Sequence, residues 1–459
     1  MDDSGDARAV GATPVKAWRS VLLLFASVIS WASAAASQSQ PYPGPDQRAI
    51  YQRLLKIIDG IPIFDNHGHP GYADDADVDQ LPGPPNPNLS LRAREDNPEL
   101  IAAAKALWGY PYGDLTAEHE KWLIQKKAEL KQNSGDRYFD QVLDKVNIQT
   151  AIANRVAMPP YLDQERFRWV FFCDAFLFPF DIKAYAAQNP DLGVFVPASQ
   201  SLLHRYMHQG NLSTLPADLV GYLEFVTRTL AENQRAGGVG IKFEVAYLRP
   251  VVFGDPSREQ AAALYAKYYN GGLPTLSEYY TFQDYIFRFL LAEAGRMHLP
   301  VQIHTAVGIG NYYNMSGGSP LNLENILRDP RYSNTTFVLL HGGYPFEHAA
   351  IWLTALKNVY LDSSLLDVYL YPSELKTVLK DWLSTYPDKI VFGSDAFPFN
   401  EALGAEEVYW LGVRTAREAL AAALAEMVSE GDVSESRAEQ MAHAFLHDTA
   451  AGIYANPRQ

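Results

Sequence analysis

The stretch IPIFDNHGH (residues 61–69) joins a short apolar run to two histidines that are separated by one glycine. In an extended strand, side chains two positions apart point to the same side, so His67 and His69 can reach one metal ion together. Residues 61–65 therefore predict a strand that ends at a pair of metal ligands. Because a lone H-x-H pair also occurs by chance, its meaning depends on what the rest of the chain places beside it.

Seven more short apolar or β-branched runs follow this stretch and alternate with longer amphipathic segments. They predict strands at residues 148–155, 169–174, 240–245, 301–304, 337–341, 359–362 and 390–393. Most of these runs are almost continuously apolar, which is typical of parallel strands that are covered on both faces. With helical patterns between them, the eight strands predict an α/β fold, a (β/α)8 TIM barrel.

Two connections are unusually long for such a barrel. Residues 70–140 follow the first strand and residues 250–277 follow the fourth. Because both follow strands, we expect both insertions on the catalytic face, where they would roof the site. We expect residues 37–459 to form one barrel domain, with residues 442–454 as a helix packed against its outside.

The composition excludes several classes of protein. The chain has 459 residues with 53 acidic and 38 basic side chains, so its net charge is −15. No Lys/Arg run offsets this charge, which argues against a nucleic-acid partner. The single cysteine, Cys173, rules out both an intramolecular disulfide and a cysteine-based zinc cluster. Any metal must therefore be held by His, Asp, Glu or Lys.

The N-terminal segment has the pattern of an export signal. Lys16 and Arg19 precede the apolar residues 21–29, and the small residues 32–36 follow with an A-x-A cleavage pattern. The apolar run is shorter than the roughly 20 residues that span a bilayer. We expect residues 1–36 to be a signal peptide, so that the mature protein is periplasmic or secreted and not inserted in a membrane. The alternative is a disordered leader or a misassigned start.

Ligand-type side chains also end three of the later strands. His304 ends the strand at 301–304, His341 ends that at 337–341, and Asp395 follows residues 390–393. The carboxyl ends of barrel strands converge on the mouth of the barrel. With His67 and His69, the sequence thus predicts five potential ligands or catalytic groups at one mouth.

Four further residues are candidates for substrate binding. Arg155 and Asp174 end the second and third strands, and Lys242 and Tyr247 lie at the end of the fourth. Arg155 can clamp a substrate carboxylate through two hydrogen bonds, or it can form a structural ion pair with Asp174. Lys242 in its protonated form can likewise bind a substrate carboxylate. The sequence leaves these alternatives open.

The motifs at these positions resemble the amidohydrolase superfamily, specifically its amidohydrolase-related (amidohydrolase 2-type) metal-dependent hydrolases. FDNHGH at 64–69 resembles the opening H-x-H of that family, and HGGYP at 341–345 resembles its strand-six motif. VYLDSS at 359–364 and FGSDA at 392–396 resemble its strand-seven and strand-eight motifs. The resemblance extends over roughly residues 61–454.

The resemblance implies a role for each site residue. His67, His69 and His304 would bind a divalent metal, with zinc as the expected ion. Asp395 would be both a ligand and the general base toward a water whose pKa can fall from about 15.7 to about 7 on zinc. His341 would polarise the substrate or shuttle protons. We expect one ion, and two if Lys242 is carboxylated and bridges them.

These roles predict an enzyme that cleaves a C–N or C–O bond, as in an amide or lactone, of a small polar molecule. The same site could instead carry out non-oxidative decarboxylation of an aromatic or unsaturated acid. A binding barrel without turnover is the third alternative, and the presence of all five site residues argues against it. The chain could also assemble as a homodimer.

Overall fold

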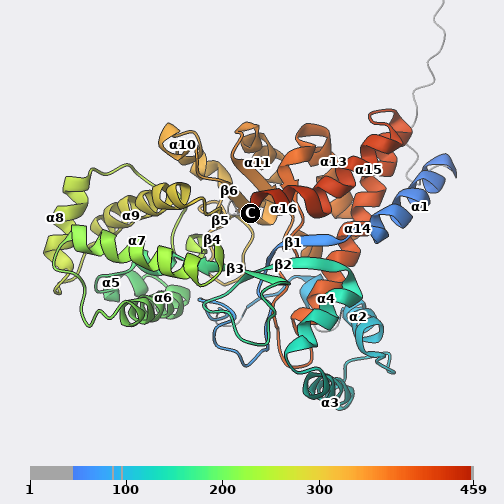
Figure 1. Cartoon of the computed structure of the whole chain (residues 1–459), viewed down its shortest axis with the longest axis horizontal. Helices are drawn as coiled ribbons and strands as arrows, with labels where there is room; N and C mark the ends of the chain where they lie inside the picture. The colour runs from blue at the N-terminus through green and yellow to red at the C-terminus, as the bar shows by residue number, and fades with distance from the viewer. Residues whose placement is uncertain (1–44, 85–86, 95–96, 456–459) are drawn as a thin grey trace, which may run out of the picture. The chain divides into compact units, whose positions relative to one another are not determined.

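Eight parallel strands follow one another in chain order around a barrel (Figure 1). The strands are β1 (Ile63–Gly68), β2 (Ile148–Asn154), β3 (Phe167–Phe172), β4 (Gly238–Phe243), β5 (Val301–His304), β6 (Phe337–Leu340), β7 (Val359–Asp362) and β8 (Ile390–Val391). The backbone N–H groups of Ser394 and Asp395 donate to the carbonyl of His67, and these hydrogen bonds close the barrel between β8 and β1. The predicted (β/α)8 barrel is confirmed.

The computed structural model describes residues 45–84, 87–94 and 97–455. The predicted signal peptide, residues 1–36, lies outside the described residues and stays a prediction. Within the described ranges, no helix combines the length and the apolar character needed to cross a membrane.

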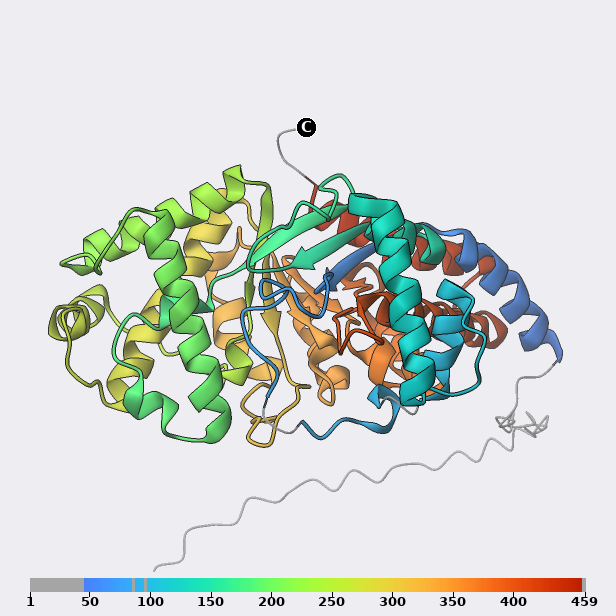
Figure 2. The ribbon, with the colours of Figure 1, turned by 90° about the horizontal axis from the view of Figure 1, so that it is seen from below.

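Helices flank the strands on both sides in the two views (Figures 1 and 2). They are α1 (Pro45–Gly60), α2 (Pro98–Trp108), α3 (Ala117–Ser134), α4 (Tyr138–Val146), α5 (Lys183–Ala186), α6 (Pro190–Gln209), α7 (Leu219–Arg235), α8 (Arg258–Tyr268), α9 (Leu276–Met297), α10 (Glu324–Leu327), α11 (Glu347–Ala350), α12 (Leu366–Tyr369), α13 (Pro372–Thr385), α14 (Ala405–Glu430), α15 (Glu435–His443) and α16 (Thr449–Ile453). Sequence signals set their ends. At α9, for example, Thr275 and Glu278 form a capping box that satisfies N–H groups of the first turn.

The two insertions are only partly the roof that the sequence predicted. In the first one, α2 and α3 pack beside α14, and the buried Lys127 of α3 lies 2.9 Å from Glu407 of α14. In the second, α8 packs against α7 and α9 at the flank of the molecule (Figure 1). Each helix buries its apolar side against a neighbouring helix, which is why it does not extend over the mouth. Residues 70–84 do approach the mouth, as described below.

The C-terminal segment corrects another expectation, because it fills the amino end of the barrel instead of packing on its outside. Tyr454 is buried, and its ring stacks on Phe64 of β1 with 6.0 Å between the centroids. Its hydroxyl accepts a hydrogen bond of 2.6 Å from Gln302 of β5. An eight-stranded barrel leaves inner space that side chains must fill, and the tyrosine fills the lower part of it.

Candidate active site

His67 and His69 lie at the carboxyl end of β1, where the pairing with β2 is irregular between Asp65 and Gly68. Asp395 reaches them from the end of β8. Gly393 permits this close approach, because a Cβ at that position would lie 2.5 Å from Asp362 Oδ2. Local backbone geometry therefore brings residues that are more than 300 positions apart in the sequence to one point.

These three residues form a compact group of ligand atoms. His67 Nε2 lies 3.0 Å from Asp395 Oδ1, and His69 Nε2 lies 3.5 Å from the same oxygen. All three side chains are buried, and one ligand atom from each falls within 4.8 Å of the others. The structure thus brings together the β1 pair and the β8 carboxylate, as the strand ends predicted.

The neighbours of His67 fix which of its nitrogens carries the proton. Asn154 Nδ2 donates to Gln302, so the Oδ1 of Asn154 faces His67 Nδ1, at 2.7 Å. This oxygen can only accept, and Nδ1 must therefore be the protonated nitrogen. The lone pair of Nε2 is left pointing at the Asp395 carboxylate, which is itself an acceptor.

The same argument applies to the other two histidines. Ser364 Oγ donates its single proton to Asp362 at 2.6 Å, so it accepts from His341 Nδ1 at 2.9 Å. His304 Nε2 donates to the carbonyl of Val307 at 2.8 Å. His304 Nδ1 and His341 Nε2 then face each other as two lone pairs, 3.0 Å apart.

Burial keeps these imidazoles neutral. It lowers the pKa of His69 to about 4, and it holds the pKa values of His67, His304 and His341 well below the usual range of histidine. Burial also raises the pKa of the Asp395 carboxyl. A proton on an imidazole is therefore a poor way to separate the facing lone pairs, whereas a cation between them would bind both.

Lys242 of β4 lies between the two sets of lone pairs. Its Nζ is 3.4 Å from His67 Nε2 and 3.7 Å from Glu244 Oε1, and the side chain is buried. Neutral imidazole nitrogens and carboxylate oxygens are ligands that zinc and related divalent metals bind in proteins. Lys242 can donate to His67 Nε2, but the nitrogens and the carboxylate that converge around it are also a donor set that fits a divalent metal. His304 faces His341 and is not in the group formed by His67, His69 and Asp395.

Two predicted substrate-binding residues hold a loop instead of facing the metal ligands. The buried guanidinium of Arg155 donates to Asp75 at 2.5 Å and to the carbonyls of Pro70 and Ala157. Asp174 accepts from Gln80 Nε2 at 2.7 Å and from a backbone N–H. The alternative ion pair between Arg155 and Asp174 is wrong, because both side chains bind the segment 75–80, whose path the strand pattern does not encode.

Aromatic side chains line the mouth beside these ligands. The ring of Tyr247 lies 4.7 Å from that of His304 and 4.8 Å from that of Tyr313. Phe172 at the end of β3 stacks near His69, with 6.3 Å between the rings. Tyr247 thus lies beside the ligands as the sequence predicted.

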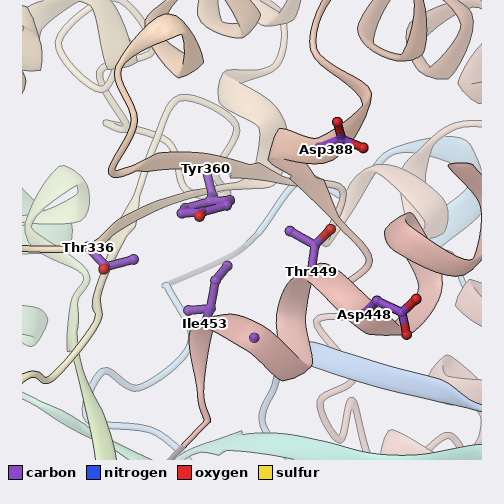
Figure 3. A pocket seen from close by; sticks show the side chains of 7 residues that line it. Thr336, Tyr360, Asp388, Asp448, Thr449 and Ile453 are labelled. Carbon is purple, nitrogen blue, oxygen red and sulfur yellow. The ribbon is translucent and has the colours of Figure 1, made fainter. Parts of the chain in front are cut away.

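Two hollows of the molecule lie away from these ligands. One of about 480 Å³ opens at the amino end of the barrel, where Tyr360 of β7 lies opposite Thr449 and Ile453 of α16 (Figure 3). A second, of about 620 Å³, is lined by residues near Asp136 and Asp163. The candidate ligands themselves are covered, with Asp395 only 7% exposed.

Sequence reasoning missed three polar residues of this site. Glu244 lies two residues after Lys242, Ser364 lies two residues after Asp362, and Asp79 ends an acidic run that begins at Asp74. In an extended chain, residues two positions apart point to the same side. This spacing from Lys242 and from Asp362 could have identified Glu244 and Ser364. Asp79 carried no such signal, because its place depends on the path of a loop.

Comparison with known proteins agrees with this geometry. A family model described as Amidohydrolase matches residues 224–455, which is half of the chain. The matched segment includes Lys242, His304, His341 and Asp395. The chain belongs to the amidohydrolase family.

Three known proteins are similar to this amidohydrolase to different extents. Protein fluG of Emericella nidulans is 27% identical over 165 residues, which is 36% of this chain but only 18% of that protein. A proposed metal-dependent hydrolase of Lactobacillus casei is 18% identical, with a TM-score of 0.58 over 88% of this chain and 98% of its own. The uronate isomerase of Thermotoga maritima is 13% identical, with a TM-score of 0.56 over 90% and 100%. At these identities the two solved structures show the shared fold.

Proposed function

We propose that this amidohydrolase is a metal-dependent hydrolase that cleaves a C–N or C–O bond, as in an amide or lactone, of a small polar molecule. Family membership supports a metal-dependent enzyme of this general kind. The proposal adds to this membership the hydrolytic reaction and the type of bond that is cleaved.

One observation carries the proposal. The partners of four buried histidines commit one nitrogen of each ring, or face it. The other nitrogens of His67 and His69 are directed at Asp395, and those of His304 and His341 at each other. Buried nitrogens aimed at each other and at a carboxylate are costly without a partner, and a cation among them would supply one. Such a set suits an ion that polarises a substrate and lowers the pKa of water.

The residues of the chain divide the remaining work. Asp395 is placed to accept the proton of the attacking water, because its carboxylate lies at the mouth with the raised pKa that burial produces. Ser364 holds His341 with the proton on Nδ1, so its Nε2 can accept a proton from a substrate hydroxyl or from water and then pass it to the leaving group. Tyr247 and Tyr313 exclude water above His304.

The charges around the mouth suggest the chemistry of the substrate. Arg155 is committed to Asp75, and Arg249 pairs with Asp284 at 2.8 Å. Two further acids, Asp79 and Glu244, lie beside His69. We therefore propose a substrate that offers N–H or O–H donors to this acidic side, with the metal available for an anionic group.

The geometry also favours the alternative of two ions over the single ion expected from the sequence. His67, His69 and Asp395 form one group, whereas His304 and His341 face each other as a separate pair. Lys242 lies beside His67, where a carboxylated side chain could serve both groups. We propose zinc as the ion, because the first group offers two imidazole nitrogens and a carboxylate and the second offers two imidazole nitrogens.

Turnover in ¹⁸O-labelled water distinguishes the reactions open to this site. The zinc-loaded protein and a metal-stripped control would be tested on matched amides, lactones, uronates and aromatic acids. Hydrolysis places ¹⁸O in the product carboxylate, whereas decarboxylation releases carbon dioxide and isomerisation changes neither mass nor composition. Metal-dependent ¹⁸O incorporation is the expected result. Carbon dioxide release without ¹⁸O incorporation would establish the decarboxylase, and metal binding without any turnover would favour a binding barrel.

Two predictions about the whole protein accompany this proposal. Export would be tested by sequencing the N-terminus of the native protein, which should begin after Ala34 or Ala36. A homodimer would be tested by light scattering of the purified protein. Neither result changes the chemistry proposed for the site.

A further inference from the structure

Residues 75–80 form a strap over the mouth of the barrel that is tied down at both ends. Asp75 accepts a hydrogen bond from Arg155, at the end of β2. Gln80 donates to Asp174, at the end of β3. In the middle, Asp77 forms two hydrogen bonds with Arg205 of α6. These anchors fix the position of the one acidic side chain of the strap that faces the metal ligands.

That side chain is Asp79. Its Oδ2 lies 3.3 Å from His69 Nδ1, while His69 Nε2 points to Asp395. The Nδ1 atom is buried and has no hydrogen-bond partner among the described residues. The distance is that of an ion pair whose hydrogen bond is not yet aligned. A small movement of the strap, whose Asp79 side chain is 31% exposed, would align it.

The other histidines obtain their orientation differently. His67 is oriented by Asn154 of β2, and His341 by Ser364, which directly follows β7. These partners belong to the barrel or to its immediate strand ends. Only His69, of the ligand histidines in the described part of the chain, faces an orienting group on the inserted strap.

Glu244 makes a second metal site at the same place conceivable, and the chemistry of imidazole argues against it. His69, Asp79 and Glu244 offer ligand atoms within 4.8 Å of one another, and the side chain of Glu244 is buried. A neutral imidazole has one lone-pair nitrogen. When His69 Nε2 binds an ion beside Asp395, its Nδ1 must carry the proton and needs an acceptor, which Asp79 provides.

We propose that Asp79 is a positioning residue that orients His69 for metal binding, so that closure of the strap and metal binding stabilise each other. The proposal rests on the metal centre proposed above. Acceptors that hold the second nitrogen of a ligand histidine typically change metal affinity by about 10- to 100-fold. By linkage, an ion that needs the closed strap must also hold the strap closed.

Zinc affinity of the full chain tests the proposal. The dissociation constant would be measured by competition with a chelator for the wild type, Asp79→Ala and Asp79→Asn. The alanine variant should bind zinc about 10- to 100-fold more weakly. The asparagine variant should lose less, because its amide oxygen still accepts from Nδ1. Asp74→Asn removes the same charge from an exposed position of the same loop and should leave the constant unchanged.

Hydrogen exchange provides a second measurement, which should not change if Asp79 has only a structural role. Zinc should slow amide exchange in residues 75–80 of the wild type and have little effect there in Asp79→Ala. Arg205→Gln loosens the strap without touching the ligands, and it should weaken zinc binding less than Asp79→Ala does. If the alanine variant does not fold, Arg205→Gln carries the test: it should still weaken zinc binding relative to the wild type, and an unchanged zinc affinity would contradict the coupling between strap and metal.

The outcomes separate this proposal from the proposed function. A wild type that binds no divalent metal overturns both. A wild type that binds zinc with an affinity equal to that of Asp79→Ala overturns the positioning role alone. Loss of one full zinc equivalent in Glu244→Gln would show that His69, Asp79 and Glu244 form a metal site themselves, which also contradicts the proposal.

Discussion

At the carboxyl end of the barrel the strands lead to His67, His304 and Asp395, whereas at the amino end the same strands surround Tyr454 with apolar side chains. Both ends are packed, but their polar atoms differ. At the amino end the tyrosine hydroxyl has a partner in Gln302. At the carboxyl end, lone pairs face lone pairs.

This difference teaches that unmatched polar atoms, and not empty volume, mark the chemical end of this barrel. The hollow of about 480 Å³ lies at the amino end, beside Tyr360 and Asp448 (Figure 3). The catalytic candidates are buried at the other end. Interiors pack densely, so a site that opens only for its substrate leaves little volume in its closed form.

A chain of hydrogen bonds connects the two ends. Gln302 donates to Tyr454 and accepts from Asn154, and Asn154 in turn accepts from His67. The apolar end therefore supports the ligand end through two buried amides. Gln302 also donates to the carbonyl of Asn66, so it should keep its position when Tyr454 is changed. We therefore expect substitutions at the amino end to affect stability and substitutions at the carboxyl end to affect metal binding and turnover.

The largest effect is expected at Asp395. Asp395→Asn keeps the shape and an oxygen ligand but removes the base, so kcat of the zinc-reloaded variant should fall at least about 10³-fold. The folded structure should survive, because the change is isosteric. Steady-state kinetics with measured zinc content would check this. A reloaded variant within about tenfold of the wild type would make His341 the base instead.

The next effect is at the opposite end and should appear in stability alone. Tyr454→Ala removes a buried ring from the barrel and should lower the free energy of unfolding by about 3–5 kcal/mol. Its zinc affinity should change by less than the roughly tenfold expected for loss of a group that directly orients a ligand. Denaturant unfolding and zinc competition would be compared, with Tyr454→Phe as the control that keeps the ring.

The pH dependence of zinc binding should also distinguish the buried ligands from ordinary histidines. The pKa of His69 is lowered to about 4, and those of His67 and His304 are lowered as well. A lowered pKa means that protons begin to displace the metal only as the pH falls well below the usual value near 6.5. Zinc affinity should therefore change little between about pH 7.5 and about pH 6. A steep loss that begins at about pH 6.5 would mean that these rings are accessible to protons.

The smallest effect is expected at the hollow of the amino end. Asp448 lines it and is 65% exposed, with His447 as its partner at 2.9 Å. An exposed pair of this kind contributes about 0–1 kcal/mol, so Asp448→Asn should leave stability, zinc affinity and turnover close to those of the wild type. Loss of activity in this variant would show that the hollow takes part in function. It would contradict the assignment of chemistry to the carboxyl end alone.

The sequence predicted the features that follow from strands. Apolar runs of a few residues placed all eight strands, and the rule that strand ends converge brought His67, His69 and Asp395 together. The features that depend on the paths of loops could not be predicted. Arg155 and Asp174 were expected to face the substrate, but they bind the strap, and no pattern in the sequence indicates where a loop of that length returns to the barrel. The segment around Tyr454 was misplaced because an amphipathic helix can cover either the outside or the end of a barrel.

The metal content of the purified full-length protein tests the central claim most directly. Elemental analysis would compare the wild type with the double variant His67→Ala/His69→Ala after both are loaded with zinc and desalted. The account predicts at least one tightly held equivalent per chain in the wild type, two if His304 and His341 hold an ion of their own, and at least one fewer in the double variant. A wild type without stoichiometric metal, or a double variant with the same content, would contradict the assignment of this end of the barrel as a metal centre.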